Sequence, residues 1–152
     1  MKRIIAALII GFVFFACGEQ TEPLMPLDKG APNTVTLSNG EIVYKLDGEW
    51  SCVLKMSVRD KAEDIIKISQ DGNTFVGIYI NGNQYKSAGD GAIKGELEKN
   101  GFKSVYVNAA RVHSGEAKGW KPATGKISEN CNKIITNVKV EGINQKLSLN
   151  RK

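Results

Sequence analysis

The sequence predicts an all-β domain, an antiparallel meander of about eight to ten strands that closes into a small barrel. The first observation is a set of Asn-Gly and Asp-Gly pairs between short β-branched or aromatic segments. The six pairs are Asn39-Gly40, Asp47-Gly48, Asp71-Gly72, Asn81-Gly82, Asp90-Gly91 and Asn100-Gly101. Such pairs populate the left-handed backbone conformations that two-residue hairpin turns require. A sheet with this many strands must pair or cover its edges, and closing into a barrel does so.

The second observation is the alternation of apolar and polar residues, which is clearest over residues 50–58. There Trp50, Cys52, Leu54, Met56 and Val58 form one apolar face, as expected for a strand with one side in a core. The other predicted strands cover residues 42–46, 64–70, 74–80, 84–87, 93–98, 103–109, 125–128, 133–141 and 145–151. Residues 111–124 show no strand pattern, so we expect a loop there in which Trp120 either folds back over the barrel or stands exposed as a contact.

The N-terminus has the pattern of an export signal. Lys2 and Arg3 precede an apolar run over residues 4–15, and that run is shorter than the roughly 20 residues that a membrane-spanning helix needs. The sequence Phe14-Phe15-Ala16-Cys17 then resembles the lipobox of bacterial lipoproteins, although Phe14 stands where Leu is usual. The resemblance implies that residues 1–16 are a signal peptide and that Cys17 is lipidated. The alternative is cleavage by an ordinary signal peptidase, which leaves a soluble secreted protein.

This interpretation divides the chain into the signal peptide, a Pro-containing lipid-anchored tether over residues 17–34 and a β-barrel domain over residues 35–152. Gly18 follows the cysteine where the retention signal has Asp, so the expected location is the cell envelope, at the outer membrane. Without Lys2 and Arg3, 19 basic residues face 16 acidic ones, and the formal net charge falls from +5 to +3. The basic residues are also scattered among acids, which argues against nucleic acid as a partner.

The remaining cysteines, Cys52 and Cys131, are expected to form a disulfide in an oxidising compartment. The alternative is a pair of free buried thiols. The chain has no Cys-x-x-Cys motif and a single histidine, His113, so we expect no metal and no cofactor.

One further motif carries a resemblance to a family. Gly48-Glu49-Trp50 matches the Gly-x-Trp signature of lipocalins and the wider calycin barrels, and Arg151 stands near the end of the last predicted strand. The resemblance implies that Gly48, Trp50 and Arg151 close one end of a lipocalin-like barrel, with the guanidinium packed on the indole ring. The second and third lipocalin motifs are not evident and the domain is short, so the presence of a cavity is left open.

A barrel of about eight strands either fills its interior with side chains or holds one small ligand. Gly77 and Gly95 are expected to mark bends in the wall or clearance for a ligand. The expected inward residues are Leu54, Met56, Val58, Phe75, Tyr79, Ile93, Leu97, Val105 and Val107. The candidate ligand-binding residues among or beside them are Leu54, Met56, Phe75, Tyr79 and Trp120.

The sequence therefore predicts an envelope lipoprotein that binds a small apolar or amphiphilic ligand. The alternative is a module that binds a protein or inhibits an enzyme, because the layout is similar to that of the c-type lysozyme inhibitor lipoproteins. The Ser-Gly-x-x-Tyr-type inhibitory segment of those proteins is not present here, and residues 85–89 resemble it only loosely. An enzyme is not expected, since the sequence has no Gly-x-Ser-x-Gly motif, no phosphate-binding glycine-rich loop and no second histidine. The sequence does not indicate an oligomeric state.

Overall fold

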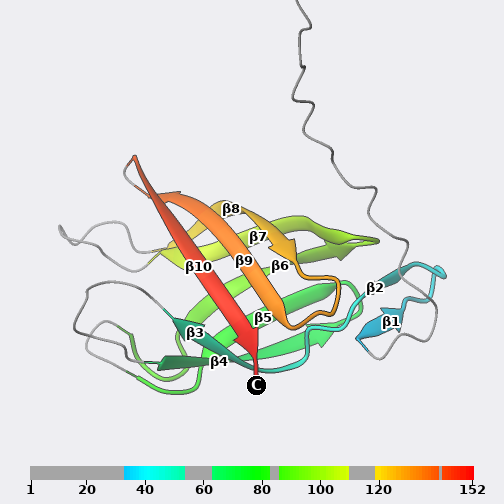
Figure 1. The fold of residues 1–152 in the computed structure, drawn as a ribbon, viewed down its shortest axis with the longest axis horizontal. Coiled ribbons are helices and arrows are strands. Elements are labelled where there is room, and N and C mark those ends of the chain that lie inside the picture. The colour runs from blue at the N-terminus through cyan, green and yellow to red at the C-terminus, as the bar shows by residue number, and fades with distance from the viewer. Residues whose placement is uncertain (1–32, 54–62, 83–85, 110–118, 141) are drawn as a thin grey trace, which may run out of the picture.

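The computed structural model describes residues 33–53, 63–82, 86–109, 119–140 and 142–152, and they form an all-β, antiparallel closed barrel (Figure 1). The predicted fold class is confirmed, and no helix occurs among the described residues. The strands are β1 (Thr34–Thr36), β2 (Ile42–Tyr44), β3 (Gly48–Val53), β4 (Glu63–Asp71), β5 (Thr74–Tyr79), β6 (Gly91–Glu98), β7 (Gly101–Ala109), β8 (Gly119–Ile127), β9 (Lys133–Val140) and β10 (Ile143–Arg151).

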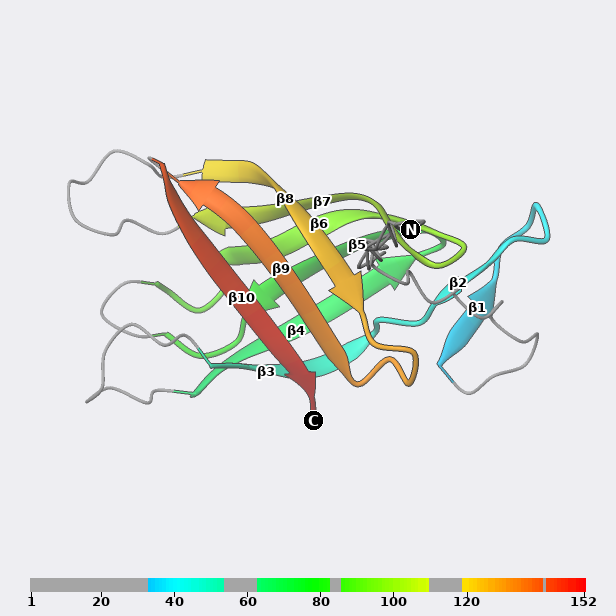
Figure 2. The ribbon, with the colours of Figure 1, turned by 45° about the horizontal axis from the view of Figure 1, so that its top comes forward.

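The barrel is a simple meander of eight strands. Each strand from β3 to β10 pairs with its neighbours in sequence, and β10 closes the circle by pairing with β3. The closing register places Arg151 opposite Trp50 and Leu149 opposite Cys52. Strands β1 and β2 form a separate two-stranded hairpin beside one end of the barrel (Figures 1 and 2). Thr34, which the sequence placed in the tether, is the first residue of β1.

The two ends of the barrel differ. We call the end that carries the start of β3, the end of β10 and the β4–β5, β6–β7 and β8–β9 connections the closed end. At the opposite end lie the end of β3, the start of β4 and the last residue of β5, Tyr79. Four segments of the chain that lie outside the described residues follow strands running toward this opposite end. They are residues 54–62, 83–85, 110–118 and 141.

Three of the six predicted turn pairs lie at hairpin connections. Asn39-Gly40 lies between β1 and β2, Asp71-Gly72 covers the last residue of β4 and the one after it, and Asn100-Gly101 covers the first residue of β7 and the one before it. Gly40 and Gly72 have φ angles of 84° and 58°, which side chains disfavour and glycine adopts readily. The other three pairs lie next to strand ends without forming the hairpin turn that was predicted.

Two strand predictions need correction. Of the predicted strand over residues 84–87, the described part contains only an isolated bridge at Lys86. The predicted loop over residues 111–124 is wrong in its second part, because β8 begins at Gly119 and pairs with β7 and β9. Pro122 and the small residues of this strand hid its alternation from the sequence pattern, since proline lacks the N–H that a ladder uses.

The barrel interior follows the predicted alternation. Along β5, Phe75, Gly77 and Tyr79 point inward and the residues between them are exposed. The predicted inward residues Phe75, Tyr79, Ile93, Leu97, Val105 and Val107 are all buried. The predictions for Leu54, Met56 and Val58 lie outside the described residues.

Gly77 makes room for neighbouring core side chains. A Cβ atom at this position would lie 2.8 Å from an Ile93 methyl carbon and 2.9 Å from an Ile66 methyl carbon, so the space in front of Gly77 is already filled. At Gly95 the limiting neighbour is the main chain of Ser104 on β7, where β6 and β7 shift register. Both glycines fit the expected bend in the wall, because the β5–β6 pairing also shifts register, between Gly77 and Ile78. The space in front of Gly77 is taken by core side chains and not by a ligand.

Candidate functional site

The closed end is sealed by Trp50 and Arg151, as the resemblance to calycin barrels implied. Trp50 is fully buried, and its indole Nε1 donates a hydrogen bond of 2.9 Å to the main-chain oxygen of Leu46. The guanidinium carbon of Arg151 lies 4.5 Å from the centre of the Trp50 ring. This distance is within the range of a cation–π contact.

Arg151 also holds three main-chain oxygens around the closed end. Its Nε donates to Cys131 (3.0 Å), its Nη1 to Asp47 (3.0 Å) and its Nη2 to Lys45 (2.6 Å). Gly48 has a φ angle of 128°, and a Cβ there would lie 3.6 Å from Nη1 of Arg151. The predicted trio of Gly48, Trp50 and Arg151 is therefore brought together as one structural seal.

The predicted disulfide is not formed, since Cys52 and Cys131 are both free and buried. Cys131 lies at the closed end, where its thiol donates to Lys45 O (3.3 Å) and lies 3.3 Å from Nη2 of Arg151. Cys52 pairs with Asp64 of β4, toward the opposite end. The length of the loop that a disulfide would close does not determine where the two sulfur atoms lie.

Burial keeps both thiols protonated at neutral pH. It raises the pKa of Cys52 to about 12. It also raises the pKa of Cys131, although the hydrogen bond and the charge of Arg151 act in the opposite direction. Because the thiolate is the reactive form of cysteine, these are inert packing residues of the barrel interior.

The opposite end holds a buried ion pair. Lys86 Nζ lies 2.8 Å from Asp64 Oδ2, and the two side chains are 7% and 4% exposed. The same ammonium lies 4.0 Å from the centre of the Tyr79 ring. Burial, followed by the nearby Cys52 and Asp64, raises the pKa of the Tyr79 hydroxyl, which therefore stays neutral at physiological pH. The interior here is polar and charged.

Two polar atoms on the wall formed by β9 and β10, Thr136 Oγ1 and Gln145 Nε2, are buried and have no hydrogen-bond partner among the described residues. Thr136 is fully buried and lies opposite Leu147, while Gln145 lies opposite Val138. Both residues thus share the inward face of their strands with apolar neighbours. They occupy diagonal positions of one antiparallel pair, about 7 to 8 Å apart.

The five candidate ligand-binding residues are not gathered in one place. Phe75 packs against Phe102 with ring centres 5.6 Å apart, whereas Tyr79 lies at the opposite end of the same strand. Trp120 lies on β8 and pairs with Asn108 on the outer face of the barrel. The predicted loop around it and the alternative in which it folds back over the barrel are therefore wrong, while the alternative of a surface contact stays a prediction. Leu54 and Met56 lie outside the described residues.

Lys86, Thr136 and Gln145 were not predicted from the sequence as interior polar residues. A signal for Thr136 was present, because it falls at an inward position of the alternation in β9. Gln145 likewise shares the inward positions of Leu147 and Leu149 in β10. Polar residues at inward positions of a barrel strand mark either a satisfied network or a place for a ligand.

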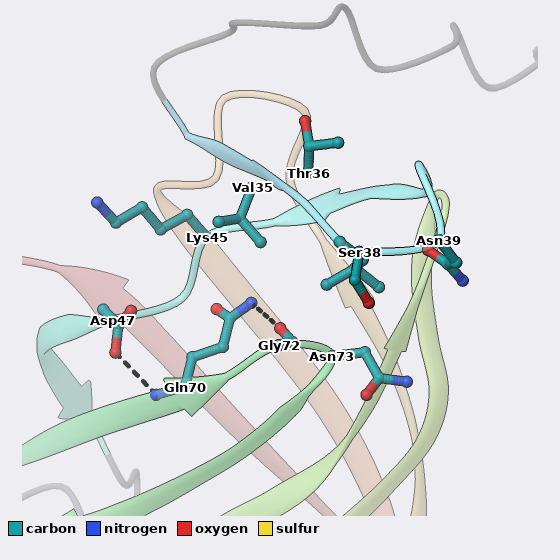
Figure 3. Close-up of a pocket in the computed structure, with 10 residues that line it drawn as sticks. Val35, Thr36, Ser38, Asn39, Lys45, Asp47, Gln70, Gly72 and Asn73 are labelled. Carbon is teal, nitrogen blue, oxygen red and sulfur yellow. Dashed lines mark hydrogen bonds between the residues drawn. The ribbon is translucent and has the colours of Figure 1, made fainter.

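A pocket of about 490 Å³ lies outside the barrel, between the β1–β2 hairpin and the closed end (Figure 3). Gln70 is its central side chain: its Nε2 donates to Gly72 O (2.9 Å) and Tyr44 O (3.0 Å), and its Oε1 accepts from Leu46 N (2.6 Å). The main-chain N–H of Gln70 also donates to Asp47 Oδ1 (2.7 Å). The polar groups of the pocket are thus hydrogen-bonded to one another. We therefore interpret the pocket as the contact region that attaches the β1–β2 hairpin to the barrel.

Comparisons with protein-family models, with curated proteins and with solved structures give no match to this chain. Among the described residues, no helix has the length and apolarity required to cross a membrane.

Proposed function

We propose that this protein is a lipid-anchored envelope protein whose barrel binds a small amphiphilic ligand, entering from the end opposite the Trp50–Arg151 seal. The observation that carries the proposal is the pair of buried atoms Thr136 Oγ1 and Gln145 Nε2, which have no hydrogen-bond partner in the described part of the chain. A buried polar atom without a partner costs about 1 to 3 kcal/mol, and such groups are rare in folded proteins. A ligand oxygen would accept a hydrogen bond from the amide of Gln145 and could pair with the Thr136 hydroxyl.

The surrounding groups favour an amphiphile over a wholly apolar molecule. Around Thr136 and Gln145 the inner wall is apolar, with Val138, Leu147 and Leu149 on the same two strands. The Asp64–Lys86 pair and the Tyr79 ring lie toward the opposite end. The apolar part of an amphiphilic ligand would pack on Val138, Leu147 and Leu149. Its polar group would lie near the Asp64–Lys86 pair and the Tyr79 ring.

Replacing Thr136 with valine and Gln145 with leucine together removes both unpartnered atoms at nearly constant shape. We expect the Thr136→Val/Gln145→Leu variant to bind a dansyl-labelled fatty acid roughly 30-fold more weakly, which corresponds to two hydrogen bonds of about 1 kcal/mol each. Its free energy of unfolding should be equal to or higher than that of the wild type, because two unsatisfied groups are gone. Fluorescence titration and urea denaturation measure the two effects.

The matched control is Asn137→Val/Asn144→Leu, which makes similar changes at exposed positions on the outer face of the same two strands. This control should bind the probe like the wild type. Equal affinity for the probe in all three proteins would contradict the proposed site.

The proposed anchor rests on the basic residues Lys2 and Arg3, the apolar run over residues 4–15 and the lipobox-like Ala16-Cys17 that follows it. We expect the intact mass of the protein isolated from bacterial membranes to correspond to residues 17–152 plus a diacylglyceryl group. The Cys17→Ser variant should lack the lipid mass and remain unprocessed. A wild-type mass without lipid would contradict the anchor and leave the ligand site untouched.

The alternative function, contact with another envelope protein or inhibition of an enzyme, requires an apolar surface outside the barrel. Trp120 lies on the outer face near several exposed apolar residues, among them Ile78 and Tyr106. This surface is the feature that favours a macromolecular contact in addition to the ligand site.

A further inference from the structure

The outer face of β5 to β8 carries an apolar patch. Val76, Ile78 and Ile80 on and just after β5 are 44%, 38% and 40% exposed, and Tyr106 on β7 is 38% exposed. These are four of the five exposed large hydrophobic residues in the described part of the chain, and the fifth is Ile143. We call Val76, Ile78, Ile80, Tyr106 and Trp120 the outer patch. Figure 2 shows that its strands lie side by side.

The residues of the outer patch are neighbours in the sheet. Val76 pairs with Lys94, and Lys94 pairs with Tyr106. The ring of Trp120 on β8 reaches across to β6, where a Cβ at Gly91 would lie 2.6 Å from a ring carbon. Ile78 pairs with that same Gly91. Gly91 therefore lets the indole join the residues of β5 in one continuous surface.

The charges within this surface are positive. Lys94 Nζ lies 4.5 Å from the centre of the Trp120 ring, and Lys67 pairs with Ile78 from the other side. The paired row from Ser69 to Pro122 includes no carboxylate. In the row that contains Ile78 and Gly91, the nearest carboxylate is Glu49 on β3, which lies opposite Lys67 at the margin of the patch. On β6 the next outward residue, Glu96, already forms an ion pair with Lys103 at 3.0 Å.

We propose that the outer patch rests on an anionic lipid surface. Trp and Tyr side chains with an apolar body and a polar tip are favoured at membrane interfaces, and lysines can place their ammonium groups among anionic headgroups. The pairing of every barrel strand on both sides leaves no free edge for strand addition, so an occupant must lie on the face.

The position of the domain in the chain supports this occupant. The proposal rests on the anchor at Cys17 described above. Residues 17–32 separate that cysteine from the first described residue, Asn33, and 16 residues reach at most about 55 Å when extended. A barrel held on such a short tether stays close to the bilayer and can turn the outer patch toward it. A weak surface contact is then sufficient to orient the barrel.

Quenching of Trp120 by brominated lipid tests the contact at the patch itself. The full chain is mixed with vesicles of brominated phosphatidylglycerol or of brominated phosphatidylcholine, and tryptophan fluorescence is recorded. The chain contains two tryptophans, and Trp50 is fully buried at the closed end. We expect strong quenching with phosphatidylglycerol, weak quenching with phosphatidylcholine, and loss of the quenched component in the Trp120→Phe variant.

Two sets of variants separate the apolar from the charged contribution. Val76→Thr/Ile78→Thr keeps β-branched residues in the strand and should reduce the quenching, while Ile143→Thr, at the exposed apolar residue on β10, should not. Lys67→Gln/Lys94→Gln should weaken binding to phosphatidylglycerol roughly 30-fold, at about 1 kcal/mol per lysine. The exposed lysines of β8 and β10 provide the control Lys126→Gln/Lys146→Gln.

The same experiment has outcomes that overturn the proposal. If the chain sediments with vesicles but Trp120 is not quenched, the anchor holds and the outer patch does not contact lipid. If sedimentation velocity shows a dimer that Val76→Thr/Ile78→Thr abolishes, and lipid does not quench Trp120, the patch is an interface between two copies. Binding of the dansyl fatty acid is measured separately, so a failed ligand site is distinguishable from either result.

Discussion

Replacing Trp50 with alanine is expected to lower the free energy of unfolding by about 3 to 5 kcal/mol, the range for truncating a fully buried aromatic side chain. Trp50 is completely shielded from solvent, and the change removes its hydrogen bond to Leu46 and its contact with Arg151. Urea denaturation followed by far-UV circular dichroism measures the loss without depending on tryptophan fluorescence.

A double-mutant cycle with Arg151→Leu isolates the contact between the ring and the guanidinium. We expect a coupling energy of about 0.5 to 2 kcal/mol between the two positions. Tyr106→Ala on the outer face serves as the control, because surface substitutions usually change stability by about 0.5 kcal/mol or less. A Trp50→Ala protein as stable as this control would show that Trp50 does not seal the barrel.

The second large effect is expected at the buried ion pair. Asp64→Leu leaves the buried Lys86 ammonium without this carboxylate, and breaking one side of a buried pair costs about 3 to 5 kcal/mol. The double variant Asp64→Leu/Lys86→Met should recover most of the loss, since it removes both charges together. Urea denaturation of the three proteins at neutral pH gives the comparison.

The surface pair Lys103–Glu96 is the control for this cycle. Its side chains are 63% and 42% exposed, and exposed pairs contribute about 0 to 1 kcal/mol. Glu96→Gln should therefore have a small effect. If Asp64→Leu were as mild as Glu96→Gln, or if the double variant were no more stable than Asp64→Leu alone, the Asp64–Lys86 contact would not behave as a buried ion pair.

The sequence predicted the barrel because two local signals agree along most of its length. Alternation separates the buried and exposed residues of β5 and β9, and Asp71-Gly72 and Asn100-Gly101 lie at hairpin connections. The seal was also predictable, because Arg151 lies on the inward face by the same alternation and pairs with Trp50 in the closing register.

What the sequence did not predict depends on distances between strands. The prediction of a disulfide failed because Cys52 and Cys131 lie toward different ends of the barrel. The prediction that Trp120 lies in a loop failed because its strand carries Pro122 and few apolar residues. Its position on the outer face is explained by the close approach of its ring to Gly91. Asp64 and Lys86 are 22 residues apart in the sequence, and the residues around each of them do not predict that the two side chains form an ion pair.

Native mass spectrometry of the purified protein tests the claim of an interior ligand site most directly. We predict that the wild type, purified or incubated with fatty acids and phospholipids, retains one noncovalent amphiphile per chain. The Asn137→Val/Asn144→Leu control should retain it as well, and the Thr136→Val/Gln145→Leu variant should lose it. Retention of the same molecule by all three proteins, or by none of them, would contradict a site built on Thr136 and Gln145.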